Sequence, residues 1–340
     1  MLPKRVKQSD IAKALNLSVQ TVSMALRGHK RISKATRLKV ERTARRLGYQ
    51  ADPTMAALAN YRTQHARKQS QWDRVALLHD WASKDDWLRY AHYQRLRSEL
   101  ISETSHRGIK LQEFWVGPHG KNRVAVLRKL RNLGIKSILL APPSEGRDPS
   151  PIQIPKTDFH VVTFGPDSAY PDQHVIQFDY YANLRLTWQA LWQRGCRRIG
   201  LSYPEDLGWR TNHAWLAAYL AEKQLAGMHP GELPPRIHGP QTKPEDLIQW
   251  AHSLQLDALI SPIAGDLFTL RERMPEIQIA SMHQSAREPG VDPNPEHAAF
   301  AAIEILQFEI NHALLQKSRF NLRIHIPGKW IDTSDKSQHP

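Results

Sequence analysis

Residues 10–28 are Asp-Ile-Ala-Lys-Ala-Leu-Asn-Leu-Ser-Val-Gln-Thr-Val-Ser-Met-Ala-Leu-Arg-Gly, and they contain two short helical patterns separated by a turn. Apolar residues at helical spacing predict a first helix over 8–15. Asn16 tolerates a left-handed backbone and is expected to end that helix. Ser18 is a good N-cap for a second helix over 19–26, which Gly at the end of the stretch would close. The pattern predicts two helices joined by a tight turn.

A third helix is predicted over 34–47, with Ser33 as its N-cap and Gly48 at its end. Its apolar stripe consists of Leu38, Val40, Ala44 and Leu47. Three short helices with a tight turn between the first two are typical of a DNA-reading trihelical module.

The charge of the chain supports this interpretation. Residues 1–70 hold 16 Lys and Arg against only Asp10, Glu41 and Asp52, a net of +13 out of +14 for the whole chain. The other 270 residues hold 31 basic against 30 acidic side chains. A basic head on a neutral body indicates that one small domain meets a polyanion while the rest has another task.

The segment after the head predicts a hinge. Asp52 as N-cap and Pro53 at the first helical position begin a helix within 51–62 that is too short to be stable alone in water, so a partner must order it. Residues 63–73 are polar and are expected to form a linker. The predicted organisation is a DNA-binding domain over 1–50, the hinge helix, the linker and a body over 74–340.

Composition limits the class of protein. A chain of 340 residues that is 41% apolar is long enough for a head and a body of two lobes. A single cysteine, Cys196, cannot form an intrachain disulfide, and the N-terminus lacks an apolar signal segment, so a cytoplasmic location is expected. No apolar run approaches the roughly 20 residues of a membrane helix.

In the body, strand and helix patterns alternate, which predicts an α/β fold with parallel sheets covered by helices. The predicted strands are 75–78, 111–116, 137–140, 161–164, 198–202, 236–238, 258–261, 277–280 and 323–326. The predicted helices are 88–106, 121–133, 181–194, 210–226, 244–254, 266–273 and 296–316. Two units of this kind would form a pair of doubly wound lobes with a cleft between them.

Residues 5–62 resemble the N-terminus of the lactose-repressor (LacI/GalR) family. The shared motifs are Asp-Ile-Ala at 10–12, Leu-Ser-Val-Gln-Thr-Val-Ser at 17–23, Ile-Ser-Lys-Ala-Thr-Arg at 32–37 and Leu-Gly-Tyr at 47–49. The resemblance implies that Val19 and Gln20 lie in the major groove and that paired hinge helices of a homodimer insert Leu58 into the minor groove. The predicted DNA-binding residues are Ser18, Val19, Gln20, Thr21, Ser23, Met24, Arg27, Arg31 and Leu58.

Two departures concern which operator is bound. Met24 stands where family members usually have Arg, and the hinge has Asp-Pro-Thr-Met-Ala-Ala where an Asn and a basic residue are common. The body resembles the family more weakly, in 175–179, in Arg-Gly-Cys-Arg-Arg-Ile-Gly ending at 200, and in Ile-Pro-Gly-Lys-Trp ending at 330. This implies a body like periplasmic sugar-binding proteins, with a small effector in its cleft.

Ligands of such sheets bind beyond the carboxyl ends of strands. The predicted effector-binding residues are Asp80, Trp81, Trp115, Asp179, Arg210, Asp266 and His283. Arg210 and Asp266 match positions that touch the effector in the family. Polar groups beside aromatic rings suit a sugar or another polyol, so a carbohydrate effector is expected. Asp179 has an alternative interpretation as a helix cap.

Motifs for catalysis and metal binding are absent from the sequence. We therefore expect no enzyme activity, no cofactor and no metal site. The main hypothesis is a DNA-binding transcription regulator, most often a repressor in this family, that acts as a homodimer on a pseudo-palindromic operator. The alternatives are an effector-independent regulator with a vestigial cleft and an enzyme tethered to DNA.

Overall fold

The structure is a computed structural model that describes residues 6, 8–26, 32–49, 73–144, 152–155, 157–239, 241–262, 270–283, 289–312 and 321–332. The chain divides into two compact units, Met1–Gln69 and Ser70–Pro340. The predicted hinge helix over 51–62 and all of the linker except Asp73 lie outside the described residues. None of the described helices is long and apolar enough to cross a membrane.

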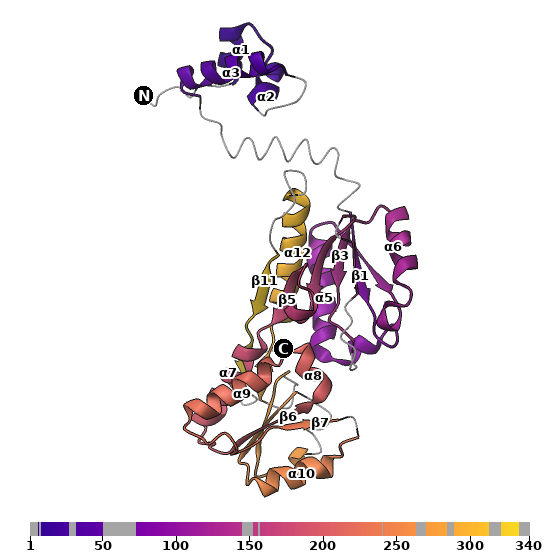
Figure 1. The fold of residues 1–340 in the computed structure, drawn as a ribbon, viewed down its shortest axis with the longest axis vertical. Coiled ribbons are helices and arrows are strands. Elements are labelled where there is room, and N and C mark those ends of the chain that lie inside the picture. The colour runs from indigo at the N-terminus through magenta and orange to yellow at the C-terminus, as the bar shows by residue number, and fades with distance from the viewer. Residues whose placement is uncertain are drawn as a thin grey trace. The chain divides into compact units, whose positions relative to one another are not determined.

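The first unit contains the trihelical head (Figure 1). Its helices are α1 (Gln8–Leu15), α2 (Val19–Leu26) and α3 (Lys34–Leu47), which confirms the predicted bounds. Asn16 adopts a left-handed φ of 52° between the first two. The core of the head consists of Ile11, Ala12, Val22, Ala25, Val40 and Ala44. One apolar face of each helix thus closes a small core.

Local hydrogen bonds set the helix ends. The Ser18 hydroxyl accepts from the backbone N–H of Thr21 at 3.0 Å, and Ser33 accepts from that of Thr36 at 3.1 Å. Gly48 ends α3 with a left-handed φ of 72°. These caps satisfy backbone groups that a helix end leaves without an intrahelical partner.

The first lobe of the second unit is a sheet in the order β11-β5-β4-β3-β1-β2, in which each described pair of neighbouring strands is parallel. Its strands are β1 (Arg74–His79), β2 (Lys110–Trp115), β3 (Ser137–Leu140), β4 (His160–Phe164), β5 (His174–Phe178) and β11 (Arg323–Ile326). Val75 and Leu77 pack with α5 (Ala91–His106) and α12 (Pro295–His312). Ala76 and Leu78 pack with α6 (Arg123–Asn132) on the other face. Alternate residues of β1 therefore bury both faces.

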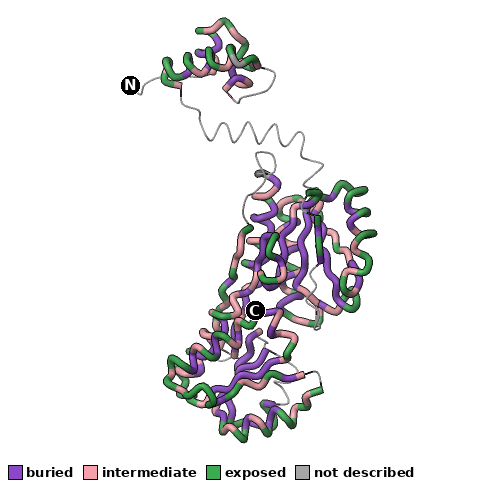
Figure 2. The backbone as a smooth tube through the Cα atoms, viewed as in Figure 1, coloured by how far each residue is buried: buried purple, intermediate pink, exposed green. Residues whose placement is uncertain are grey.

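The second lobe repeats this arrangement in the order β12-β10-β9-β8-β6-β7, and among its described strands only β10 and β12 pair antiparallel. Its strands are β6 (Ile199–Pro204), β7 (Arg236–His238), β8 (Ala258–Ser261), β9 (Gln278–Ser281), β10 (Gly290–Asp292) and β12 (Lys329–Ile331). One face packs on α7 (Tyr180–Gln193) and α9 (Ala214–Leu225), the other on α10 (Pro244–Ser253). Figure 2 shows both sheets as buried layers.

The chain crosses between the lobes three times, after β5, after β10 and after β11. Hydrogen bonds join these crossings. The backbone N–H of Asp179 donates to the carbonyl of Ile326 at 2.8 Å, and that of Gly328 donates to Asn183 Oδ1 at 2.7 Å. Asn294 Nδ2 donates to the Pro327 carbonyl at 2.7 Å. The three crossings therefore form one bonded hinge.

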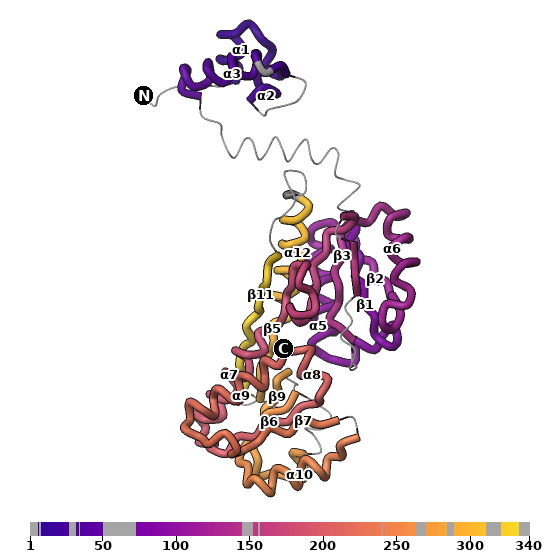
Figure 3. The backbone as a smooth tube through the Cα atoms, viewed as in Figure 1, coloured from indigo at the N-terminus to yellow at the C-terminus, as the bar shows by residue number. Residues whose placement is uncertain are grey.

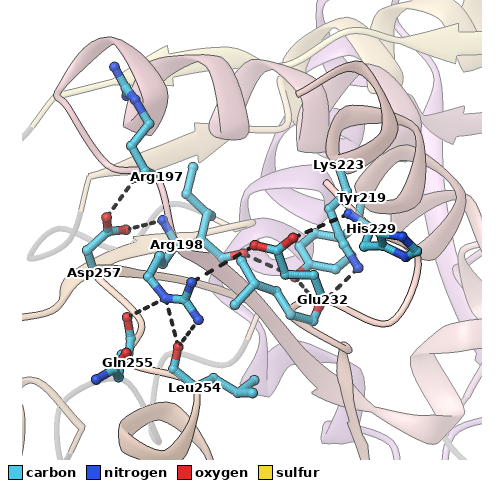
Figure 4. A network of polar contacts seen from close by, with 11 residues as sticks. Arg197, Arg198, Tyr219, Lys223, His229, Glu232, Leu254, Gln255 and Asp257 are labelled. Carbon is cyan, nitrogen blue, oxygen red and sulfur yellow. Dashed lines mark hydrogen bonds and ion pairs between the residues drawn. The ribbon is translucent and has the colours of Figure 1, made fainter. Parts of the chain in front are cut away.

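A polar network holds the second lobe at the amino ends of its strands (Figure 4). The Asp257 carboxylate accepts from the backbone N–H groups of Arg197 and Arg198 at 2.7 and 2.9 Å. The Arg198 guanidinium donates to the carbonyls of Leu254 and Gln255 beyond α10. The paired arginines of the Arg-Gly-Cys-Arg-Arg-Ile-Gly motif thus have a structural role.

Several predicted element bounds need correction. The helix predicted over 210–226 begins only at Ala214, as α9, because Asn212 and His213 adopt left-handed φ angles of 52° and 55°. Arg210 instead ends a separate short helix, α8 (Glu205–Arg210). The helix predicted over 88–106 begins at Ala91, after a 3-10 turn over Asp86–Arg89. Strands β5, β10 and β12 are not among the predicted strands. Residues 266–269 and 313–316 of two predicted helices lie outside the described residues.

Candidate nucleic-acid interface and ligand cleft

The outward face of α2 is the candidate nucleic-acid interface. Val22 and Ala25 are fully buried in the head, whereas Val19 is 48% exposed and Gln20 is also exposed. Val19 and Gln20 are thus available to base edges in a major groove.

The remaining predicted DNA-binding residues divide into three groups. Ser18 and Thr21 hydrogen-bond to each other through their hydroxyls at 2.8 Å, so their first task is to cap α2. Ser23 and Met24 are partly exposed on the same helix. Arg27, Arg31 and Leu58 lie outside the described residues.

Helix α3 adds positive charge to the head. Its exposed basic side chains are Lys39, Arg42, Arg45 and Arg46. Glu41 is the only acidic residue within α3. This charge distribution attracts phosphates without regard to sequence.

The interface between the lobes of the body is filled by aromatic rings around one arginine. Arg210, at the end of α8, is only 5% exposed, and its Nη2 donates to the Tyr93 hydroxyl of the other lobe at 3.2 Å. Its Cζ lies 5.4 Å from the centre of the Trp81 ring. Nη1 lies 3.7 Å from Asp206 Oδ2 and makes no hydrogen bond within the described part of the chain. A buried guanidinium with a free donor is a candidate ligand contact.

The space beside Arg210 is small. A cavity of about 30 Å³ lies between the lobes, bordered among others by Tyr93, Phe178, Arg210, Trp215 and His283. This volume holds about one or two water molecules. As the lobes stand, their own side chains occupy the centre of the cleft.

A larger cavity of about 190 Å³ lies at the carboxyl end of β1. It is lined by Asp80, Trp81, Ala82, Asp86, Arg89, Pro118, His119 and Ser144. Burial raises the pKa of the Asp80 carboxyl, against hydrogen bonds that include those from Ser144. A carboxylate, a guanidinium, an imidazole and an indole around one space can bind a small polar molecule.

The predicted effector-binding residues are distributed as follows. Asp80 and Trp81 line the larger cavity, and Arg210 and His283 line the smaller one. Trp81 connects the two, because its ring also contacts Arg210.

Of the other three predicted effector-binding residues, Trp115 and Asp179 lie outside both linings. Trp115 donates from Nε1 to the Trp81 carbonyl at 2.8 Å and so helps to hold the backbone of Trp81 in place. Asp179 caps α7 by accepting a hydrogen bond from Ala182 N–H at 2.9 Å, which agrees with its alternative interpretation as a helix cap. Asp266 lies outside the described residues.

Sequence reasoning missed several residues of this region. Tyr93 and His92 sit on α5, Arg89 and Asp86 in the turn before it, and His119 in a left-handed conformation with φ of 53°. The available signal was the dense run of aromatic, acidic and basic side chains that follows the first strand. Within the described residues, no group of three or more His, Cys, Asp or Glu is arranged to hold a metal ion.

Comparison with known proteins agrees with this geometry. Residues 8–52 match the family model described as bacterial regulatory proteins, lacI family. The whole fold is similar to a transcriptional regulator CelR–cellobiose complex, with a TM-score of 0.61 and 18% identity over 96% of this chain and 99% of that one. It is also similar to a lac repressor dimer bound to operator and the anti-inducer ONPF, with a TM-score of 0.57 and 15% identity over 97% and 98% of the two chains.

A third similar structure is a periplasmic binding protein/LacI transcriptional regulator from Alkaliphilus metalliredigens QYMF complexed with D-xylulofuranose. Its TM-score is 0.53, with 15% identity over 76% of this chain and 97% of that one. No match was found among curated protein sequences. At these identities the structural comparisons establish the fold of the body, and the family model identifies the head.

Proposed function

We propose that this chain is a DNA-binding transcription regulator of the lacI family, and that it is a cytoplasmic repressor released from its operator by a small polyol. The match of the head to the lacI family model and the similarity of the fold to solved LacI-type regulators support this proposal. The observation that carries the DNA-binding part is the face of α2, where Val19 and Gln20 are exposed over a closed core. The protein would act as a homodimer, with one head on each half-site of a pseudo-palindromic operator.

The larger cavity is the proposed effector site. Asp80 accepts hydrogen bonds from hydroxyl groups there, Arg89 and His119 donate, and the indole of Trp81 forms an apolar wall. The ligand would act on the cleft through Trp81, because this ring contacts Arg210 of the second lobe. A carbohydrate-derived molecule has the hydroxyl density that this lining suits.

Allosteric control requires that the effector bind one arrangement of the lobes better than the other. The bonded hinge of three crossings allows the lobes to move as bodies about a fixed region. A change in the spacing of the first lobes of a dimer would then move the two heads apart or bring them closer together. This coupling is worth about 5- to 150-fold in operator affinity in typical cases.

The rival function is an effector-independent DNA-binding regulator. The specific observation in its favour is that aromatic side chains leave only about 30 Å³ at the centre of the cleft. Under this alternative, Arg210 and its surrounding rings serve only to fix the lobes together.

One experiment separates the two functions. Bound DNA is selected from a random pool, and the affinity of the selected operator is measured with and without a panel of sugars and polyols. We expect at least one ligand to weaken operator binding more than fivefold. Asp80→Asn should abolish this response and leave ligand-free operator affinity unchanged.

Asp172→Asn is the matched control, because this exposed carboxylate of the first lobe lies outside both cavity linings. It should respond to the ligand like the parent. Specific operator binding that no panel member changes would favour the effector-independent regulator. A response retained by Asp80→Asn would show that the effector site lies elsewhere.

A further inference from the structure

Two buried histidines meet across the boundary between the lobes. His92 lies on α5 in the first lobe, and His283 follows β9 in the second. Figure 3 labels both of these elements along the chain. Their imidazole rings are stacked, with centroids 4.0 Å apart and an interplanar angle of 9°. Parallel rings at this distance lie in van der Waals contact over their faces, so the stack exists only while the lobes are together.

Aromatic side chains surround the pair. The Tyr93 ring centre lies 4.1 Å from that of His92, and the Phe178 ring is 6.1 Å away. The Trp215 ring centre lies 5.7 Å from that of His283. A pocket of this kind offers little solvation to a charged imidazolium.

The charged groups that face the pair are cationic. Arg210 reaches it from α8, and Arg95 lies one turn along α5 from His92. The carboxylates nearest to these arginines already pair with them: Asp206 with Arg210, and Asp292 and Glu296 with Arg95. Within the described residues, no carboxylate is bonded to either imidazole, while His283 donates to the Pro262 carbonyl.

We infer that His92 and His283 form a proton-sensitive latch on lobe closure. The neutral rings stack and hold the lobes together, and a proton taken up by either ring favours separated lobes. The latch makes the closed arrangement of the lobes depend on pH. Its effect on operator binding rests on the proposed function.

The sign of the effect follows from the protonation states. Burial, together with Arg210, lowers the pKa of His283 to about 4 in the closed arrangement. Burial also lowers the pKa of His92, aided by His283, Arg210 and Arg95. Once separated and hydrated, a histidine has an ordinary pKa of about 6.5.

Between about pH 4 and pH 6.5, the separated state therefore binds more protons than the closed state. Closure is at full strength above about pH 6.5 and is lost as the pH falls towards 4. Other contacts between the lobes involve no histidine. They include the hydrogen bond from Asn212 to Asp167 at 3.3 Å, the one from Arg210 to Tyr93, and the ion pair of Arg95 with Asp292.

Lobe separation can be measured without DNA or effector. Spin labels are placed at Ser168→Cys in the first lobe and Leu220→Cys in the second, in a Cys196→Ser background, since both positions are exposed. The distance distribution is recorded by electron-electron double resonance from pH 7.5 to 5.0. We expect the ratio of closed to separated molecules to fall at least roughly tenfold over this range.

The double variant His92→Phe, His283→Phe keeps two stacked rings that cannot bind a proton, so its ratio should stay constant with pH. His106→Phe, which changes an exposed histidine at the end of α5, is the matched control and should retain the parent's response. The latch is contradicted if the parent shows no pH response, or if the double variant responds like the parent.

Imidazole titration of the parent, followed by NMR, tests the same point without a variant that folds poorly. Rings that take up protons near pH 6.5 while the label distance stays constant would overturn the latch. Because neither measurement uses operator or effector, loss of operator control with an intact pH response would overturn the proposed function alone.

Discussion

At the scale of the residue, neighbouring positions of α2 have different roles: some pack in the core of the head and others face outward. Val22 and Ala25 are fully buried and hold the helix in the head. Gln20 lies on the opposite side of the helix from Val22 and Ala25 and is exposed. Its amide can both donate to and accept from adenine in the major groove.

We therefore expect Gln20→Ala to relax the base preference at one position in each half-site. The expected loss of discrimination is about 1–3 kcal/mol, because a bidentate amide–adenine contact is removed. The measurement is DNA selection followed by competition between matched and mismatched sites. Lys39→Ala, an exposed basic residue on α3, is the contrast and should weaken all sequences uniformly. An unchanged selected motif with Gln20→Ala would rule out this role.

At the scale of the element, capping fixes where α3 begins. Ser33 accepts from Thr36 N–H at 3.1 Å. Ser33→Ala removes this acceptor and should destabilise the head by about 1 kcal/mol, whereas Ser33→Asp keeps a capping oxygen and should cost much less. The measurement is thermal unfolding of the head by circular dichroism. Equal losses for both variants would show that the cap hydrogen bond does not set the stability of α3.

A second element-scale contact ties α12 to the sheet of the first lobe. His174 Nε2 donates to Glu309 Oε1 at 2.8 Å, while His174 Nδ1 accepts from Leu322 N–H at 3.1 Å, which fixes the tautomer. His160 Nδ1 lies 3.7 Å from the other carboxylate oxygen. Hydrogen bonds from His160 and His174 lower the pKa of Glu309 to about 2.

This depressed pKa stabilises the folded body above the unfolded value of about 4.3, and the contribution is lost as the pH falls towards 2. Glu309→Gln should therefore lower the free energy of unfolding by roughly 2–3 kcal/mol at pH 6 and by clearly less at pH 3. Urea unfolding at the two pH values measures this, with Glu99→Gln on α5 as control. A cost that is equal at both pH values would mean that the carboxylate charge is not what stabilises the contact.

At the scale of the whole molecule, the hinge region of the body is tightly packed. The backbone N–H of Gly328 donates to Asn183 Oδ1 at 2.7 Å. A Cβ at Gly328 would overlap Val291 Cγ1 and Asn183 Oδ1 and would lie 2.8 Å from the Asp292 carbonyl oxygen. Three segments far apart in the sequence thus approach one another only because residue 328 has no side chain.

Gly328→Ala should therefore force the crossings apart and lower the stability of the body by about 1–3 kcal/mol. Differential scanning calorimetry of the full chain should show a lower transition for the body and an unchanged one for the head. Gly231→Ala is the matched control, because a Cβ there meets nothing within 4 Å. A body transition equal to that of the parent would show that the crossings have room to adjust.

Local sequence patterns are sufficient to predict the head and the fold class of the body. Ser18, Asn16, Ser33 and Gly48 act on neighbours a few residues away, so the bounds of α1, α2 and α3 follow from short-range chemistry. The alternation of strand and helix patterns likewise indicates parallel sheets, because each pattern is local.

The assembly of the body depends on contacts between segments that lie far apart in the sequence. No local pattern tells that α12 joins the first lobe, that Gly290–Asp292 forms a strand, or that Asn212 and His213 interrupt a helix. The contacts of Arg210 with Tyr93 and of His92 with His283 join distant segments, and each depends on three chain crossings meeting at one hinge. Long-range packing brings these pairs together, and the spacing of residues along the chain does not predict them.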